Sequence, residues 1–345
     1  MGDDEPLAHP DEFPASRATL AWRRARLYGD RHRKLITIVG ATVAAAVLVA
    51  ILWGHRDEFA TAISSASIGV LLAAAALQLV ALLARSEAWH ICIEAAGGTV
   101  PRRILYRASS MGYVGSLLNA QVGTAARIAA LRRSSPAESP GVSTLIAAEF
   151  PILAVEATLA ALTSFTLVVP LGLPWWLPLV CLGVVLALSA GLRHLALREG
   201  RLLWSGLAVL RSLRGGGRLV GFVLIAVFAQ VFRNWLLLHA VGVDASLLDA
   251  IAVLIAMVVL TQLPIGPSTG AAAAVLILGH DGVAAVAAAG VLSTVTGIVG
   301  GLTFATWAGA DRLWTHRRAQ RVPREHRQEL PEKPQARLPS PGPGE

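Results

Sequence analysis

Long apolar blocks, separated by short polar or basic segments, dominate the sequence between residues 35 and 307. Apolar stretches of about 18 residues or more with few charges are typical of transmembrane helices. The pattern therefore predicts an all-α polytopic membrane protein. Its six predicted full spans are Leu35–Trp53, Ile68–Ala84 with an extension to Ile93, Val142–Val168, Trp175–Leu192, Leu219–Val241 and Val283–Trp307.

Two further apolar segments, Ile104–Leu131 and Leu247–Gly279, are interrupted by polar residues, glycines or prolines. In the second segment, Pro264 and Pro267 each remove a backbone hydrogen-bond donor. Unpaired backbone at membrane depth is tolerated only where it is buried in protein or lines a wet cavity. We therefore predict that both segments are re-entrant helical hairpins, which enter and leave the membrane on the same side.

Positive charge is distributed unevenly around the predicted spans. Of the 30 Lys and Arg residues, all but Arg56 and Arg233 fall on the side that also holds both termini. Because positive residues concentrate on the cytoplasmic side of membrane proteins, we expect a multi-pass protein of the cytoplasmic membrane with both termini in the cytoplasm. Residues 1–34 would form a basic cytoplasmic tail, and residues 308–345 a basic, Pro-rich, disordered one.

The order of the predicted elements repeats within the membrane domain of residues 35–307. Residues 35–168 give two spans, an inner hairpin and a span, and residues 173–307 give two spans, an outer hairpin and a span. Because the second half starts on the opposite side of the membrane, this order predicts an inverted repeat, as in many transporters. The segments Leu117–Leu131 and Leu260–Leu278 also resemble each other, since each has a Gln, a Gly-containing turn and an Ala-rich helix.

Several charged residues fall inside the predicted spans, where each costs about 2.5–3.5 kcal/mol on insertion scales and so needs a partner or a function. Glu149 and Glu156 are seven residues apart and share one helix face. Arg127 lies on the returning arm of the first hairpin, and Arg233 shares a turn with Asn234. The arginines could receive a lipid phosphate while the glutamates couple protons, or the charges could form internal ion pairs that fasten helices. A ligand contact is favoured for Arg127, whereas Arg233 could also snorkel toward the interface.

Polar residues, glycine and prolines at the two interruptions complete the predicted substrate-binding site. Half-helices that start after each interruption would direct free N–H groups and positive dipole ends toward the midplane, where an anion could bind. The polar side chains could equally serve to cap those half-helices. The predicted residues are Asn119, Gln121, Gly123, Thr124, Gln262, Pro264, Pro267, Ser268 and Thr269.

The sequence lacks the signatures of an enzyme. It has no metal-spaced set of His and Cys, no phosphate-binding loop and no GxSxG motif, and Cys92 and Cys181 have no ligand spacing. The net charge of +8 is explained by arginines that flank the spans rather than by a nucleic-acid-binding fold. We expect a protein that is not an enzyme, that uses no cofactor or metal and binds no nucleic acid, and whose partners are membrane lipids.

Short motifs in this chain resemble those of one family. They are the basic Arg85–Trp89 end of the second span, GTAAR at Gly123–Arg127, AEF at Ala148–Phe150 and LPIGPSTG at Leu263–Gly270. Together with the order of elements, they resemble the membrane domain of lysylphosphatidylglycerol synthetases and their stand-alone flippase-like relatives, over roughly residues 35–307. The resemblance implies lipid translocation between leaflets. The soluble aminoacyl-transfer domain is missing, which argues against lipid aminoacylation.

The chain departs from the family's motifs at several charged positions. Asn119 and Thr124 stand where the family typically has Pro and Glu, and Phe150 stands where it has Arg. In the second motif, Ser268 and Ala273 replace Gly and Glu. Because charges are lost, no specific headgroup is carried over. We predict a transporter of an amphipathic, anionic lipid or lipid-linked molecule. The alternative is a non-catalytic membrane partner or regulator of a cell-envelope enzyme.

Overall fold

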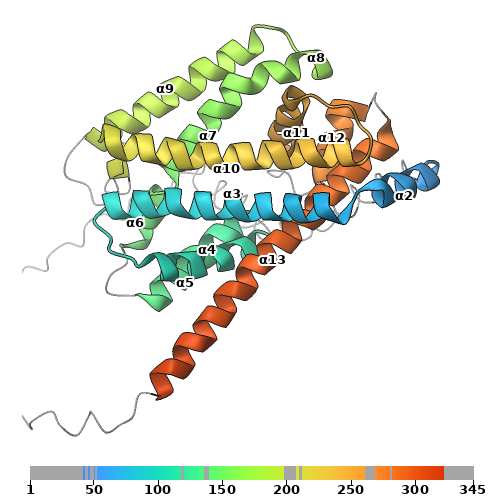
Figure 1. The fold of residues 1–345 in the computed structure, drawn as a ribbon. Helices are drawn as coiled ribbons and strands as arrows, with labels where there is room; N and C mark the ends of the chain where they lie inside the picture. Colours follow the sequence, from blue (N-terminus) through green and yellow to red (C-terminus); the bar gives the residue numbers. More distant parts are fainter. Residues whose placement is uncertain are drawn as a thin grey trace, which may run out of the picture.

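The computed structural model describes residues 53–117, 120–135, 140–197, 207–209, 212–260, 269–279 and 282–321, together with residues 42, 46 and 50. All regular elements among these residues are helical (Figure 1). They are α2 (Arg56–Ser65), α3 (Ile68–Ala95), α4 (Arg102–Ser116), α5 (Ala120–Ser134), α6 (Val142–Ala147), α7 (Phe150–Thr163), η1 (Ser164–Leu167), α8 (Val168–Leu171), α9 (Leu177–Leu197), α10 (Leu213–Ala240), α11 (Leu247–Leu260), α12 (Thr269–Leu278) and α13 (Val283–Arg321).

Five helical stretches in the described part of the chain are long and apolar enough to cross a membrane. They are Ile68–Ala95, Val142–Leu171, Leu177–His194, Leu213–Ala240 and Val283–Thr315. These stretches correspond to the last five of the six spans predicted from hydropathy, and the first predicted span lies mostly outside the described residues. Large apolar side chains such as Leu72, Val184 and Phe228 point outward, as expected for surfaces that face lipid. The chain is therefore a multi-pass membrane protein.

The most extensive contact between two helices is that of α3 with α10, which lie side by side (Figure 1). At one end, the Ser65 hydroxyl donates a hydrogen bond to the Ala240 carbonyl at the end of α10, 3.0 Å away. At the other end, Ala88 near the end of α3 shares a buried core with Val223 near the start of α10. The two helices therefore run in opposite directions.

Each of these long helices is followed by two short helices. The α4–α5 pair follows α3, and the α11–α12 pair follows α10. Because α3 and α10 are antiparallel, the two pairs lie at opposite ends of them (Figure 1). Both pairs also pack against α13, the first through α4 and the second through α12. The sequence order of a long helix, a short-helix pair and a further apolar stretch thus occurs twice.

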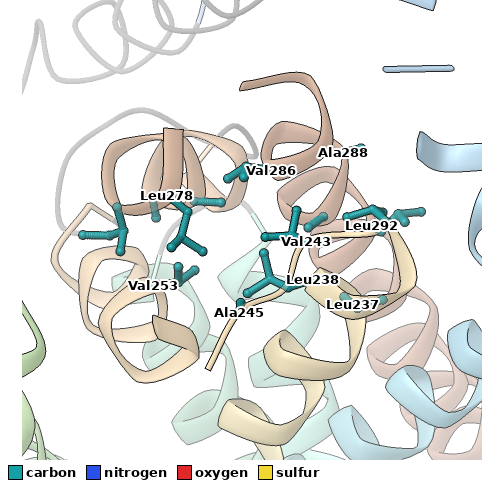
Figure 2. Packing of buried hydrophobic residues seen from close by; sticks show 14 of the residues in the cluster. Leu237, Leu238, Val243, Ala245, Val253, Leu278, Val286, Ala288 and Leu292 are labelled. Carbon is teal, nitrogen blue, oxygen red and sulfur yellow. The ribbon is translucent and has the colours of Figure 1, made fainter. Parts of the chain in front are cut away.

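Two clusters of buried apolar side chains hold the short-helix pairs in place. The core beside α11 and α12 includes Leu237, Leu238, Val253, Leu278 and Leu292 (Figure 2). The core beside α4 and α5 includes Trp89, Leu105, Leu131, Leu145 and Ile152. Since close packing provides much of the attraction between helices in a membrane, these clusters fix each pair against the long helices.

The α5 helix starts earlier than the sequence suggests. It begins at Ala120, so that Gln121, Gly123 and Thr124 form its first turns rather than an interruption before Thr124. Gly123 lets α5 pack closely on α4, because a Cβ atom at this position would lie only 2.7 Å from the Gly112 carbonyl oxygen of α4. The two helices of this pair therefore meet backbone to backbone.

Two other boundaries differ from the hydropathy pattern. The α10 helix begins at Leu213, before the predicted start of this span at Leu219, and it includes Gly215–Gly217. The Ser212 hydroxyl caps this start by accepting a hydrogen bond from the Gly215 N–H, at 2.8 Å. The α13 helix continues past Trp307 to Arg321, so that the segment expected to be the C-terminal tail begins as helix.

Candidate functional site

Arg127 on α5 meets a carboxylate and an aromatic ring within the first half of the chain. Its guanidinium forms an ion pair with Glu149, and its central carbon lies 4.1 Å from the ring centroid of Trp89 on α3. Both charged side chains are only 12% exposed. Ion pairing and cation–π attraction are both stronger in such surroundings than in water.

The position of Glu149 follows from a break between two helices. The α6 helix ends at Ala147, and α7 begins at Phe150 with Pro151 in its first turn. Proline suits that place, because the first N–H groups of a helix have no partner within the helix. Glu149 therefore lies at the junction, where its carboxylate meets Arg127.

A second ion pair adjoins the first. Arg85 Nη2 on α3 lies 3.1 Å from Glu156 Oε2 on α7, with side chains 44% and 25% exposed. Arg85 and Trp89 are four residues apart and so share a face of α3. Both Arg85 and Glu156 also interact electrostatically with Arg127. We call Arg85, Trp89, Arg127, Glu149 and Glu156 the Arg127 cluster; its two positive and two negative charges cancel.

A different polar group lies between α3, α10 and α13. Arg233 on α10 is only 4% exposed. It donates hydrogen bonds to the side-chain oxygen of Gln78 and, over 2.9 Å, to the Ser293 hydroxyl. That hydroxyl in turn donates to the Asn234 side-chain oxygen, 3.0 Å away. We call Gln78, Arg233, Asn234 and Ser293 the Arg233 cluster. Within this cluster, the side chains that accept hydrogen bonds from Arg233 are neutral.

The first short-helix pair reaches the Arg233 cluster through Tyr113 on α4. The Tyr113 hydroxyl donates to the Gly297 carbonyl on α13, 2.7 Å away. A Cβ atom at Gly297 would lie 3.4 Å from Arg233 Nη1 and 3.9 Å from the Tyr113 hydroxyl. The absence of a side chain at Gly297 therefore lets Tyr113 and Arg233 approach the same point of α13.

A third charged group ties the start of α4 to the far part of α13. The Asp311 carboxylate accepts hydrogen bonds from both Arg103 and Arg107, and Arg107 also donates to the Thr315 hydroxyl, 2.6 Å away. The hydrogen bond to Asp311 raises the pKa of the Arg103 guanidinium above its ordinary value. These bonds hold the part of α13 around Asp311 and Thr315 against the start of α4.

The structure brings several predicted site residues together. Arg127, Glu149 and Glu156 belong to the Arg127 cluster, and Arg233 and Asn234 belong to the Arg233 cluster. Internal ion pairs were one of the two roles predicted for these charges. Arg127 forms such a pair, whereas Arg233 forms none with the residues that the structure describes.

The residues predicted at the two interruptions have different outcomes. Gln121 is exposed, Thr124 is half-buried and Gly123 is buried in the contact between α4 and α5. Five of the other predicted residues lie outside the described part of the chain: Asn119, Gln262, Pro264, Pro267 and Ser268. Of Thr269, the backbone is described and the side chain is not.

Four contributors were not among the predicted site residues: Arg85, Trp89, Gln78 and Ser293. Arg85 is a charge near the end of an apolar span, and Gln78 is a polar residue in the middle of the same span. Both are unusual at such positions, and that is the signal that could have identified them. Ser293 has no comparable signal, because serine is common where membrane helices pack closely.

The fold and the buried charges define a multi-pass helical membrane protein with polar groups between its spans. The chain matches the family model described as lysylphosphatidylglycerol synthase TM region over residues 35–305. It therefore belongs to this family, as its motifs suggested. Comparisons with curated proteins and with solved structures gave no significant match. Membership of this family points to a function connected with membrane lipids.

Proposed function

We propose that the protein moves an amphipathic, anionic lipid or lipid-linked molecule between the leaflets of the cytoplasmic membrane, and that it is not an enzyme. The main supporting observation is the position of the two short-helix pairs at opposite ends of the antiparallel helices α3 and α10. In transporters with inverted repeats, short or interrupted helices of both halves meet near the midplane and form the substrate site. The family's connection with membrane lipids favours a lipid as the substrate.

In this proposal the α4–α5 and α11–α12 pairs are re-entrant hairpins, the first from the cytoplasmic side and the second from the outside. Their lengths support this, because α4 and α5 have 15 residues each and α11 has 14. At a rise of 1.5 Å per residue these helices are about 21–23 Å long, less than the hydrocarbon core of about 30 Å. Both termini are then cytoplasmic, in agreement with the positive charge of the two tails.

A headgroup that crosses the bilayer needs polar partners on its way. The Arg127 cluster and the Arg233 cluster offer such partners between otherwise apolar helices. Charged residues at this depth are costly, and they mark substrate pathways in many membrane proteins. Lipid acyl chains would remain against the exposed apolar faces of the spans while the headgroup passes the clusters.

The test uses full-length protein reconstituted into liposomes with trace amounts of a fluorescent, headgroup-proximal label on phosphatidylglycerol or phosphatidylcholine. An impermeant quencher removes the label from the outer leaflet only. We expect protein-containing liposomes to expose the inner-leaflet phosphatidylglycerol over time, while empty liposomes do not. Protein that neither moves nor binds any labelled lipid would contradict the proposal. Arg56→Gln, which removes an exposed arginine of α2, serves as the control for variants of the buried arginines and should move lipid as the wild type does.

The alternative role, as a non-catalytic partner of a cell-envelope enzyme, predicts a different pattern. Its function would depend on the tails rather than on the buried clusters. A chain that ends at Arg321, the last residue of α13, would lose cellular function under this alternative, whereas Arg127→Ala would keep it. The transport proposal predicts the opposite for both variants.

A further inference from the structure

The two buried arginines differ in their counter-charges. Arg127 contacts the Glu149 carboxylate, and the charges of the Arg127 cluster cancel. Arg233 forms no ion pair with any carboxylate in the described part of the chain, and its partners there are an amide and a hydroxyl. The sequence of residues 261–268, TQLPIGPS, contains no Asp or Glu. Arg233 is therefore a buried cation without a negative partner among these residues.

Burial of such a charge is costly unless it is paired, and a guanidinium does not lose its proton in proteins. Arg233 also retains donor capacity, because its Nε atom is buried and has no hydrogen-bond partner. A purely structural residue would rarely leave both a charge and a donor uncompensated. Inside a membrane protein, this combination indicates a position that receives an anion.

We propose that Arg233 binds the anionic group of the transported molecule, and that Arg127 chiefly fixes α5 to α3 and α7 through its ion pair. The ligand is an oxyanion, such as the phosphate of a phosphodiester. Guanidinium groups bind phosphate through two parallel N–H donors. The Nε–Nη2 edge supplies them when Nη2 exchanges its hydrogen bond to Ser293 for the anion, while Nη1 remains on Gln78. This inference rests on the proposed lipid translocation for the identity of the oxyanion.

Protein atoms cover the Nε donor, so an anion reaches it only if neighbouring elements separate. Tyr113 marks the place, because its ring packs tightly on Gly301 and its hydroxyl bonds to Gly297, beside Arg233. The preceding residue, Gly112, packs against the Cβ atom of Arg127. A shift of α4 relative to α13 would therefore open the Arg233 cluster, and the Arg127 ion pair would limit that shift.

The test measures binding of dioctanoyl-phosphatidylglycerol, dioctanoyl-phosphatidylcholine and inorganic phosphate to the full chain in detergent. We expect Arg233→Gln to weaken binding of phosphatidylglycerol by about tenfold or more, since one charged hydrogen-bonding partner is lost. Arg233→Lys, which keeps the charge without the planar edge, should lie between Arg233→Gln and the wild type. The exposed-surface variant Arg56→Gln should bind as the wild type does. Size-exclusion profiles identify folded variants, and the Lys variant decides the question if Arg233→Gln does not fold.

Each outcome supports or overturns the inference. Competition by inorganic phosphate at Arg233 supports a site for the free phosphate group, whereas binding of phosphatidylglycerol without such competition supports a lipid-borne one. The inference is overturned if Arg233→Gln binds phosphatidylglycerol as tightly as the wild type does. It is also overturned if the double variant Arg127→Gln/Glu149→Gln loses more affinity than Arg233→Gln does.

The inference and the proposed function can fail separately. Arg233-dependent binding by a protein that moves no lipid in liposomes contradicts the proposed transport and leaves the anion site intact. Lipid movement and lipid binding that are both unchanged in Arg233→Gln contradict the anion site and leave the transport intact.

Discussion

The α4–α5 pair and the α11–α12 pair each follow a helix of 28 residues and pack on α13, but the side chains beside them differ. Beside the first pair, buried arginine and glutamate side chains neutralise each other. Beside the second pair the core is apolar. Arg233, which lies between α3, α10 and α13, has neutral partners in the described part of the chain. The protein thus contains one buried group whose charges cancel and one buried positive charge that no carboxylate of the described residues balances. The charge-balanced group is suited to holding helices together, and the unbalanced charge is suited to binding an anion.

The largest effect on stability is expected at the Arg127 cluster. Arg127→Gln leaves Glu149 buried without its cation, and breaking a buried ion pair from one side costs about 3–5 kcal/mol. The free energy of unfolding in detergent measures this loss. The double variant Arg127→Gln/Glu149→Gln removes both charges and should recover most of the stability. Equal stability of Arg127→Gln and wild type would show that the pair does not hold this end of the molecule together.

A smaller loss is expected where α12 meets α13. A Cβ atom at Gly290 would lie 2.5 Å from the Ala271 backbone nitrogen, so that Gly290→Ala pushes α12 away at a cost of about 1–3 kcal/mol. The control is Gly183→Ala on α9, where an added Cβ meets nothing within 4 Å. Alanine in a helix is favoured over glycine by up to about 1 kcal/mol, so the control should unfold at the same or a higher temperature. A destabilised control and an unaffected Gly290→Ala would contradict the packing described for the second pair.

The second ion pair of the Arg127 cluster should matter less than the first. Arg85 and Glu156 are 44% and 25% exposed, and ion pairs of this kind contribute less than about 1 kcal/mol. We therefore expect Glu156→Gln to lower the free energy of unfolding by less than about 1 kcal/mol. The same chemical denaturation experiment distinguishes the two pairs. A loss as large as that of Arg127→Gln would mean that both pairs act as one unit.

The smallest effect on stability is expected at Arg233. Arg233→Gln gives up hydrogen bonds to Gln78 and Ser293, but it also removes a buried charge that has no negative partner among the residues that the structure describes. These two contributions oppose each other, so we expect a change within about 1 kcal/mol of zero in the absence of lipid. Calorimetric unfolding of lipid-depleted protein measures it. Destabilisation as large as that of Arg127→Gln would indicate a carboxylate partner for Arg233 and remove the contrast between the two clusters.

The spans could be predicted from the sequence because apolar length decides what crosses a bilayer. The extent of α13 could not, since Asp311 and the charges around it oppose a membrane helix in any hydropathy pattern. The helix continues because Arg103 and Arg107 on α4 donate hydrogen bonds to the Asp311 carboxylate, and those two arginines lie more than 200 positions earlier in the chain. The early start of α5 likewise depends on the contact between Gly123 and Gly112.

The candidate site was predicted in part for similar reasons. Charges inside apolar segments identified Arg127, Glu149, Glu156 and Arg233, because any charge at such depth needs a partner or a function. Which charges pair was not accessible from the sequence, since Glu156 pairs with Arg85, which lies 71 residues earlier in the chain. The sequence also favours a ligand contact for Arg127 over one for Arg233, because only Arg127 lies near a predicted helix break. Only the packing of the helices distinguishes a paired arginine from an unpaired one.

The opposed orientation of the two short-helix pairs is tested most directly by accessibility of single cysteines. Gln121→Cys near the start of α5 and Thr269→Cys at the start of α12 are made in a chain whose Cys92 and Cys181 have been replaced. A membrane-impermeant maleimide is then applied to vesicles of either orientation. We predict labelling of position 121 from the cytoplasmic side and of position 269 from the outside. Labelling of both positions from the same side would contradict the inverted arrangement on which the proposed lipid translocation depends.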